Sequence, residues 1–404
     1  MGTPSAYLPP ALSGTQLSEF ITSIGLPAPS SVEPLQVAAQ FHSIYTIQYD
    51  KDVAASVLDK HPDLHANADG SLELVLRVAG RHLPRIKTLN EVGIMAWVKQ
   101  NTTIPVPAIV RFDASEDNLL RHEYTLLEKV SGVSADKVYD TLSAEAKANL
   151  IDQLIDYLVQ LHQKQWTSGF VGGLIIDDKG ALARGPIIDE YFWQLPDIEK
   201  YWPGSGETIE SLNPVSPEGF PSYTAFIAAS IKHYIHAIAT HDTLASYRDL
   251  IPRLEAFITA ISADASSLNE VKYVLAHKDL HFANIMVDPS DPTGRITAIL
   301  DWEFSGIVPA PRWNPARAFL WSAQSGAGYQ DEQSALEKVF EQKCAEKGVE
   351  FLLRDAEMKG RQDEMQKVAS FVRAIVEVCP RGQAQDRVAG WRATVETMLG
   401  VFGA

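Results

Sequence analysis

The chain of 404 residues is poor in cysteine and in basic residues, and it lacks a long run of hydrophobic residues. Cys344 and Cys379 are its only cysteines, which excludes a disulfide framework and a cysteine-rich zinc cluster. Lysine and arginine number 35 against 51 aspartates and glutamates, so the net charge is −16. This charge argues against nucleic acid or an anionic membrane as the main partner. It suits a cationic small molecule such as an amine, or it serves only solubility.

Neither a membrane span nor a secretion signal is predicted. The longest apolar helical stretch, residues 223–238, contains Lys232, His233 and His236, as an amphipathic helix would. The first 14 residues have neither the basic stretch nor the apolar core of a signal peptide. Ala6 stands where a myristoylation motif has Ser or Thr. We therefore expect a cytoplasmic protein.

Local patterns divide the chain into a strand-rich part and a helical part, which predicts an α+β fold. Residues 1–36 form a leader rich in proline and serine, with one helix at residues 14–24. Residues 37–130 favour strands, and the alternation over residues 72–78 places Arg77 on the face opposite the leucines. Residues 131–404 are mainly helical, with apolar residues at helical spacing.

One stretch of the helical part, residues 277–303, carries the residue types that phosphoryl transfer needs. Asn284 follows Asp279 by five residues, and Asp301 comes just after a short apolar strand. Residues 285–288 and 296–300 predict a hairpin that brings Asn284 and Asp301 to the same end. Two carboxylates and an amide in this order can orient a hydroxyl and hold Mg²⁺. The alternative is that all three residues only cap loops and turns.

At these residues the sequence resembles the aminoglycoside phosphotransferase and choline kinase group, which has the protein-kinase-like fold. Within this group it is most similar to the fungal phosphotransferase branch. The resemblance covers roughly residues 37–321 and includes Arg77, Glu91 and the turn at residues 104–107. It implies a bilobal protein, with a nucleotide-binding N-lobe at residues 37–130. The mainly helical C-lobe, residues 131–404, would hold the catalytic hairpin and the substrate cleft.

The resemblance implies roles for the residues of the hairpin and the strand. Asp279 would orient the acceptor hydroxyl, while Asn284 and Asp301 would bind Mg²⁺. Arg77, where protein kinases have lysine, would contact the phosphates of ATP and pair with Glu91. The competing interpretations are an exposed strand charge for Arg77 and a surface pair between Glu91 and a lysine four residues earlier, Lys87.

By the same resemblance, the carbonyl of Glu128 and the amide of Val130 would bind the adenine edge; the alternative is a buried strand without function. Residues 41–50 contain no glycine, so contact with the phosphates would fall to the hydroxyl of Ser43 and nearby backbone amides. Lys278 is expected to point to solvent.

The predicted function is ATP- and Mg²⁺-dependent phosphorylation of a hydroxyl on a small molecule, cationic or aromatic. The aromatic residues of 191–202 would form a wall for such a ligand or belong to the local core. Arg312, Arg317 and Trp321 lie in a segment that lines the substrate cleft in relatives. Two alternatives stay open: a degenerate kinase-like protein that binds without turnover, and a nonstandard enzyme on the same fold.

Overall fold

A computed structural model describes residues 7–9, 11–36, 39–164, 166–315 and 329–404. It divides into two compact units. Unit 1 comprises residues 1–154, 175–183 and 279–303, and unit 2 comprises residues 155–174, 184–278 and 304–404. The predicted lobe boundary at residue 131 stays a prediction, while the units group the hairpin after Asp279 with the strand-rich part.

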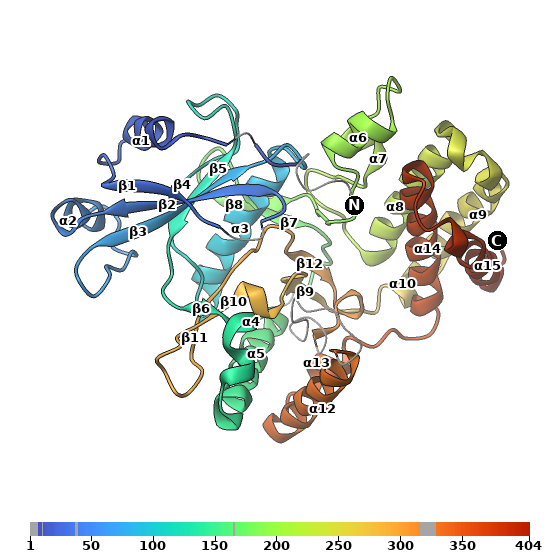
Figure 1. Cartoon of the computed structure of the whole chain (residues 1–404). Helices are drawn as coiled ribbons and strands as arrows, with labels where there is room; N and C mark the ends of the chain where they lie inside the picture. Colours follow the sequence, from blue (N-terminus) through green and yellow to red (C-terminus); the bar gives the residue numbers. More distant parts are fainter. Residues whose placement is uncertain (1–6, 10, 37–38, 165, 316–328) are drawn as a thin grey trace. The chain divides into compact units, whose positions relative to one another are not determined.

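Unit 1 is built around a five-stranded antiparallel sheet with the strand order β1-β2-β3-β5-β4. Figure 1 labels the elements of this unit. The strands of the sheet are β1 (Ser31–Pro34), β2 (His42–Tyr49), β3 (Leu72–Ala79), β4 (Ile109–Asp113) and β5 (Tyr124–Glu128). The helices that accompany it are α1 (Gly14–Ser23), α2 (Lys51–Leu58) and α3 (Ile86–Asn101).

The core of unit 1 forms on the leucine face of β3. Leu72, Leu74, Leu76 and Val78 are buried and alternate with half-buried residues, as the sequence predicts. They pack in one cluster with buried residues of α1 and α2. Arg77 therefore projects from the opposite face of the sheet.

A second, three-stranded sheet of unit 1 carries the predicted hairpin. Its strands, in the order β11-β10-β6, are β6 (Val133–Ser134), β10 (Ile285–Val287) and β11 (Ile296–Ile299). Ile285 lies opposite Ile299, and the turn between the strands ends at Gly294, whose φ of 68° suits glycine. Short helical turns flank this sheet: α4 (Ala135–Val138), η2 (Tyr139–Thr141) and η4 (Phe282–Asn284). The prediction of a hairpin is confirmed.

Unit 2 is mainly helical. Its helices are α6 (Leu195–Tyr201), α7 (Ile209–Leu212), α8 (Tyr223–Thr240), η3 (Asp242–Leu250), α9 (Ile251–Ala263), α10 (Ala265–Leu268), η5 (Ala310–Arg312), α12 (Tyr329–Lys347), α13 (Phe351–Arg354), α14 (Gln362–Arg381) and α15 (Gln385–Val401). The strands β9 (Tyr273–Ala276) and β12 (Gly306–Pro309) pair antiparallel. Three elements contain residues of both units: α5 (Ala144–Gln163), β7 (Gly173–Ile176) and β8 (Leu182–Gly185). A strand-rich unit and a helical unit confirm the predicted α+β class.

Candidate active site

The hairpin brings Asn284 and the residue before Asp301 into direct contact. The backbone amide of Leu300 donates to the carbonyl of Asn284 over 2.8 Å, so the two predicted metal ligands lie at the same end of the hairpin. Asp301 has a φ of 64°, in the left-handed region that aspartate tolerates better than most residues. This backbone conformation turns the chain sharply just after β11.

Asp279 lies beside Asn284, with 43% of its side chain exposed. The Nδ2 of Asn284 donates to the Asp279 carbonyl over 2.9 Å and to Oδ2 of Asp279 over 3.2 Å. These bonds occupy the amide nitrogen and leave the amide oxygen of Asn284 as an available acceptor. His281 Nε2 is 3.5 Å from Oδ1 of Asp279. Burial alone would lower the pKa of His281, but the carboxylate of Asp279 outweighs it and the pKa is raised.

Arg77 is the centre of an ion-pair cluster on the face of β3 opposite the leucines. Its Nη1 donates to Oε1 of Glu91 in α3, which confirms the predicted pair. Its Nη2 donates to Oδ1 of Asp301 over 2.9 Å and to Oε2 of Glu303 over 3.2 Å. Burial opposes the charge, yet Glu91 and the other carboxylates outweigh it and raise the pKa of Arg77. The guanidinium therefore stays charged, and the interpretation of Arg77 as an exposed strand residue is wrong.

Local geometry explains how these residues meet. His42 of β2 lies diagonally across from Arg77, because Ile44 is the direct partner of Arg77 in the ladder. On α3, Lys87, Asn90 and Glu91 are three and four residues apart and share one helix face. That face meets Glu303: the Nδ2 of Asn90 donates to the Glu303 carbonyl over 2.9 Å.

Lys87 is buried, with 1% of its side chain exposed, and pairs with Glu303, so the competing interpretation of a surface pair with Glu91 is wrong. Its Nζ lies 2.6 Å from Oε2 of Glu303 and 2.7 Å from Nε2 of His42. Burial lowers the pKa of His42 well below its usual value, and Lys87 and Arg77 lower it further. His42 is therefore neutral at pH 7, and its Nε2 accepts a hydrogen bond from the Nζ of Lys87.

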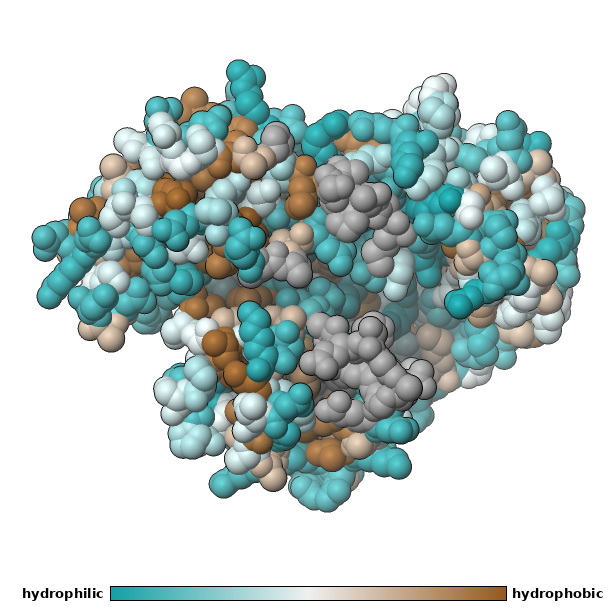
Figure 2. Space-filling model, viewed as in Figure 1, coloured by the Kyte–Doolittle hydropathy of each residue, from teal (hydrophilic) through white to brown (hydrophobic). Residues whose placement is uncertain are grey.

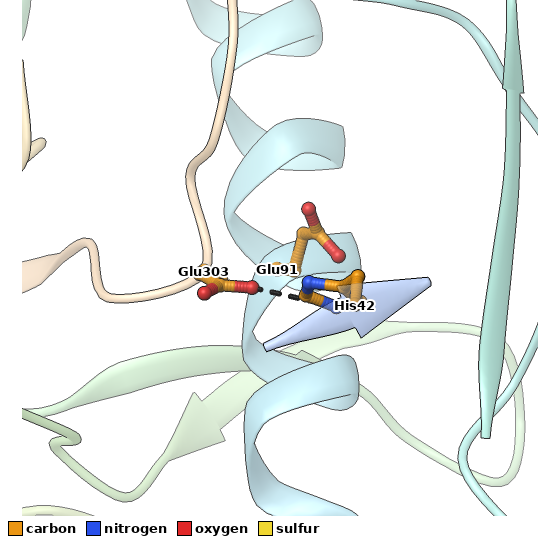
Figure 3. A group of neighbouring side chains, drawn as sticks. All are labelled: His42, Glu91 and Glu303. Atoms are coloured by element: carbon orange, nitrogen blue, oxygen red, sulfur yellow. Dashed lines mark ion pairs between the residues drawn. The ribbon is translucent and has the colours of Figure 1, made fainter. Parts of the chain in front are cut away.

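Glu303 is the carboxylate that the two cations share. Burial raises the pKa of Glu303 to about 7; Lys87 and Arg77 oppose this rise, and Asp301 reinforces it. Figure 3 shows Glu303 pointing toward His42 of β2, with Glu91 on α3 beside them. Ligand atoms of these three residues lie within 4.8 Å of one another, which is a spacing that a metal ion could bridge. Lys87 and Arg77 already occupy them, however, so we assign no metal to this group.

Ser43, the residue expected at the phosphates, is half-buried inside β2 opposite Val78. The amide of Gly80 donates to the carbonyl of Phe41, and alternation along an antiparallel ladder then directs the Ser43 amide toward Val78. A role for the Ser43 hydroxyl stays a prediction.

Glu128 ends β5, and Val130 follows in a short connection. The Glu128 side chain accepts from the amide of Ala108 over 3.2 Å and lies 2.7 Å from Nδ1 of His65. Gly132 follows with a φ of 112°, and a Cβ there would stand 2.4 Å from the carbonyl oxygen of Val287. The connection therefore depends on glycine to bring β6 alongside β10. The assignment of the Glu128 carbonyl and Val130 amide to adenine stays a prediction.

Unit 2 holds the remaining predicted residues. Lys278 is not directed to solvent as expected: its Nζ donates to the carbonyl of Ile188 and lies 3.6 Å from Oδ2 of Asp189. Arg312 lines a cavity of about 160 Å³ together with part of the aromatic segment. Arg317 and Trp321 lie outside the described residues.

Comparison with known proteins identifies the family. Residues 64–310, more than half of the chain, match the phosphotransferase enzyme family. The chain belongs to this family. A curated relative, clavilactone A biosynthesis cluster protein Y of Ampulloclitocybe clavipes, is 24% identical over 300 residues. The match covers 73% of this chain and 66% of the relative, so the chain spans just under two thirds of that protein's length.

Solved structures align with nearly the whole phosphotransferase chain at low identity. Aminoglycoside phosphotransferase APH(4)-Ia is 14% identical, with 96% of this chain and 99% of that chain covered and a TM-score of 0.47. The GDP complex of aminoglycoside 2'-phosphotransferase-IIIa is 12% identical, with the same two shares covered and a TM-score of 0.47.

One face of this phosphotransferase is largely polar (Figure 2). In Figure 2, hydrophilic residues cover most of the face in view, with hydrophobic ones scattered among them. Among the described helices, none combines the length and apolar character that crossing a membrane requires.

Proposed function

We propose that this phosphotransferase family member uses ATP and Mg²⁺ to phosphorylate a hydroxyl group of a small molecule. The observation that carries the proposal is the Arg77 cluster, in which one guanidinium joins Glu91 of α3 to Asp301 beyond the hairpin. A cation held by a helix carboxylate beside a metal-binding aspartate is what positioning of nucleotide phosphates requires. Chain segments far apart in sequence supply these groups, which makes a chance arrangement of surface charges a poor explanation.

Asp279 has the geometry of the residue that orients the acceptor hydroxyl. Its side chain is accessible, and Asn284 holds Oδ2 through a hydrogen bond of 3.2 Å. A carboxylate restrained in this way can accept a hydrogen bond from an incoming hydroxyl and take its proton as the bond to phosphorus forms. His281 lies 3.5 Å from this carboxylate, and Asp279 raises the pKa of His281 against the effect of burial.

The donor set next to Asp279 fits Mg²⁺, which prefers oxygen ligands. Asn284 turns its amide nitrogen to Asp279, and this orientation presents its amide oxygen to a cation. Asp301 adds a carboxylate at the same end of the hairpin. When bound, the ion would neutralise charge on the nucleotide phosphates. Arg77 stays protonated, and its planar guanidinium would donate N–H groups to the same phosphates.

The acceptor is proposed to be a metabolite. A relative of this chain is named after a biosynthetic gene cluster, which favours a small-molecule acceptor over a protein.

A second function, ligand binding without turnover, is favoured by one observation: three carboxylates engage Arg77 and compete with phosphate for its N–H groups. A nonstandard reaction on the same fold remains a third proposal.

Two measurements on the purified protein test the proposal. The first is the thermal unfolding midpoint with and without millimolar Mg-ATP, alongside a control kinase. The second is incubation with Mg-ATP and a panel of hydroxyl-bearing metabolites, with phosphorylated products identified by mass spectrometry. We expect a raised midpoint and at least one product that is absent with the Asp279→Asn variant. A raised midpoint without any product would favour the binding protein, and an unchanged midpoint would reject nucleotide binding.

A further inference from the structure

Unit 2 contains a cavity of about 160 Å³ whose walls come from the segment before α6, from α8, from η5 and from α14. The residues that line this cavity include Asp189, Tyr191, Phe226, Tyr234, Arg312 and Arg373. None of the residues assigned to phosphoryl transfer lines it. A ligand of this cavity can therefore be sought independently of nucleotide and metal.

The size and the aromatic walls of the cavity fit a single six-membered ring. An engineered apolar cavity of roughly 150 Å³ is enough to hold benzene. Tyr191, with 44% of its surface exposed, and Phe226 present rings to the space. Each ring has a guanidinium over it: Arg373 lies 4.1 Å from the Tyr191 centroid and Arg312 lies 4.7 Å from the Phe226 centroid. A ligand with several sugar rings exceeds this volume.

The charge of the cavity is unlike that of the chain. Arg373 is paired with Glu377, and Asp189 lies 3.6 Å from Lys278. Arg312 makes no ion pair or hydrogen bond with any described side chain, although it is half-buried. Asp189 of the same cavity acts on Arg312 electrostatically without a direct ion pair. A half-buried guanidinium whose N–H groups lack a hydrogen-bond acceptor is costly unless water or an anion meets them. The whole chain, by contrast, carries a net charge of −16.

Tyr234 supplies a second polar group to the cavity wall. Its hydroxyl has no hydrogen-bond partner within the described part of the chain. Burial raises the pKa of Tyr234 to about 12, and the phenol is therefore neutral at pH 7 and can donate. An occupant of the cavity thus meets a fixed cation, a neutral hydroxyl and two aromatic rings.

We propose that this cavity binds a small aromatic carboxylate with one ring, such as a hydroxybenzoate, whose carboxylate group pairs with Arg312. The ring packs against Phe226 and Tyr191, and the carboxylate accepts two N–H groups of the guanidinium. Tyr234 donates to an oxygen of the same ligand. The site therefore selects an anion, in contrast to the amine that the acidic composition suggests.

Isothermal titration of the full chain, without nucleotide or metal, tests this assignment. The probes are 4-hydroxybenzoate, its neutral isostere 4-hydroxybenzamide and the cation benzylamine. We expect the acid to bind and each of the other two to bind at least about tenfold more weakly, because only the acid forms charge-assisted bonds with Arg312. Equal binding of acid and amide, tighter binding of the amine, or no binding of the acid would overturn the proposal.

Variants locate the site and separate it from phosphoryl transfer. Arg312→Met should weaken binding of the acid by about tenfold or more, whereas Arg387→Met, at an exposed position of α15, should leave it unchanged. Asp279→Asn should also bind the acid as the unmodified chain does, whether or not phosphorylation is ever observed. If Arg312→Met does not fold, the preference for acid over amide in the unmodified chain decides the question. Undiminished binding by folded Arg312→Met would reject the cavity as the site.

Discussion

The guanidinium of Arg77 and the carboxylate of Asp301 lie 2.9 Å apart although 224 residues separate them in the chain. This bond connects β3 to the turn that follows the hairpin. It brings the proposed phosphate-binding cation next to a proposed metal ligand, within unit 1. The two residues therefore report on one site, and changes at either should alter nucleotide binding.

Replacing the two aspartates of the site should have different effects. Asp301→Ala removes a proposed metal ligand and should weaken Mg²⁺-dependent ATP binding, with a loss of several kcal/mol of transition-state stabilisation if turnover is seen. Asp279→Asn should abolish transfer and leave ATP affinity nearly unchanged, because its role is toward the hydroxyl. Asp117→Asn, at an exposed loop residue, is the control. Equal losses of ATP affinity in the Asp279 and Asp301 variants would refute this division of roles.

Arg77→Ala should raise the apparent Michaelis constant for ATP and lower turnover, and Arg77→Lys should restore part of each. Rescue should be incomplete, because lysine offers a point charge where arginine offers a planar fork. Arg111→Ala, at an exposed arginine in β4 of the same sheet, should stay within about 0.5 kcal/mol of the unmodified chain. Kinetics of the three variants at varied ATP decide the matter. Full rescue by lysine, or no effect of alanine, would contradict the assignment.

Lys87 and Glu303 should be coupled in stability. Glu303→Gln removes the only carboxylate in the described part of the chain that pairs with buried Lys87, and loss of one partner of a buried pair costs about 3–5 kcal/mol. Lys87→Met should cost less, because Arg77 still pairs with Glu303 over 3.2 Å. The double variant should cost clearly less than the sum of the two. Denaturant unfolding of all four proteins measures this coupling.

An exposed ion pair on the same helix provides the control for the Lys87 and Glu303 variants. Lys99 of α3 pairs with Asp63 over 2.8 Å, but both side chains are largely exposed. Lys99→Met should therefore cost about 0–1 kcal/mol. Additive effects at Lys87 and Glu303, or a large effect at Lys99, would show that burial does not control the strength of these pairs.

Stability should fall as the pH drops below about 6.5, in part through His82. Burial lowers the pKa of His82 well below its usual 6.5, and Lys87 and Arg77 add to this. The unfolded chain then takes up a proton that the folded chain does not, so the stabilisation is complete above 6.5 and is lost at lower pH. In His82→Gln the decline of the unfolding midpoint between pH 6.5 and 5 should be shallower. The raised pKa of Glu303 acts in the opposite direction in both proteins and cancels in the comparison; parallel curves would exclude His82.

Gly132→Ala should be more destabilising than Gly180→Ala. Both glycines have positive φ, which costs roughly 1–3 kcal/mol for other residues. A Cβ at residue 132 would also stand 2.4 Å from the Val287 carbonyl oxygen, whereas nothing lies within 4 Å at residue 180. The difference between the two thermal unfolding midpoints isolates this contact, and equal midpoints would mean that the backbone yields at no cost.

Short-range patterns predicted the elements of this chain well. The alternation of residues 72–78 survives in β3 because one face of the strand packs on the core and the other does not. The hairpin was predictable because its turn residues and two short apolar runs adjoin in sequence. The pair of Arg77 with Glu91 followed from the resemblance to a family. The spacing of the motif singled out Asp279, Asn284 and Asp301, of which Asp301 contacts Arg77.

Contacts between distant segments were predicted less well. The i,i+4 rule offered Glu91 as the alternative partner of Lys87, whereas its carboxylate partner Glu303 is 216 residues away. One sequence signal could have indicated this contact. Lys87, Asn90 and Glu91 share one face of α3, and three polar residues on one helix face can be buried together only if a polar partner covers them. The cavity with Arg312 combines segments from several parts of unit 2, and no local pattern joins them.

An arginine at residue 77 also determines which reagents can label this protein. Reagents that acylate the strand lysine of protein kinases need an amine that can lose its proton, and a guanidinium does not meet this need. The neighbouring amine, Lys87, is buried, and Glu303 holds its ammonium group. If Arg77 contacts the nucleotide phosphates as proposed, chemical surveys that capture kinases through the strand lysine would pass over this chain.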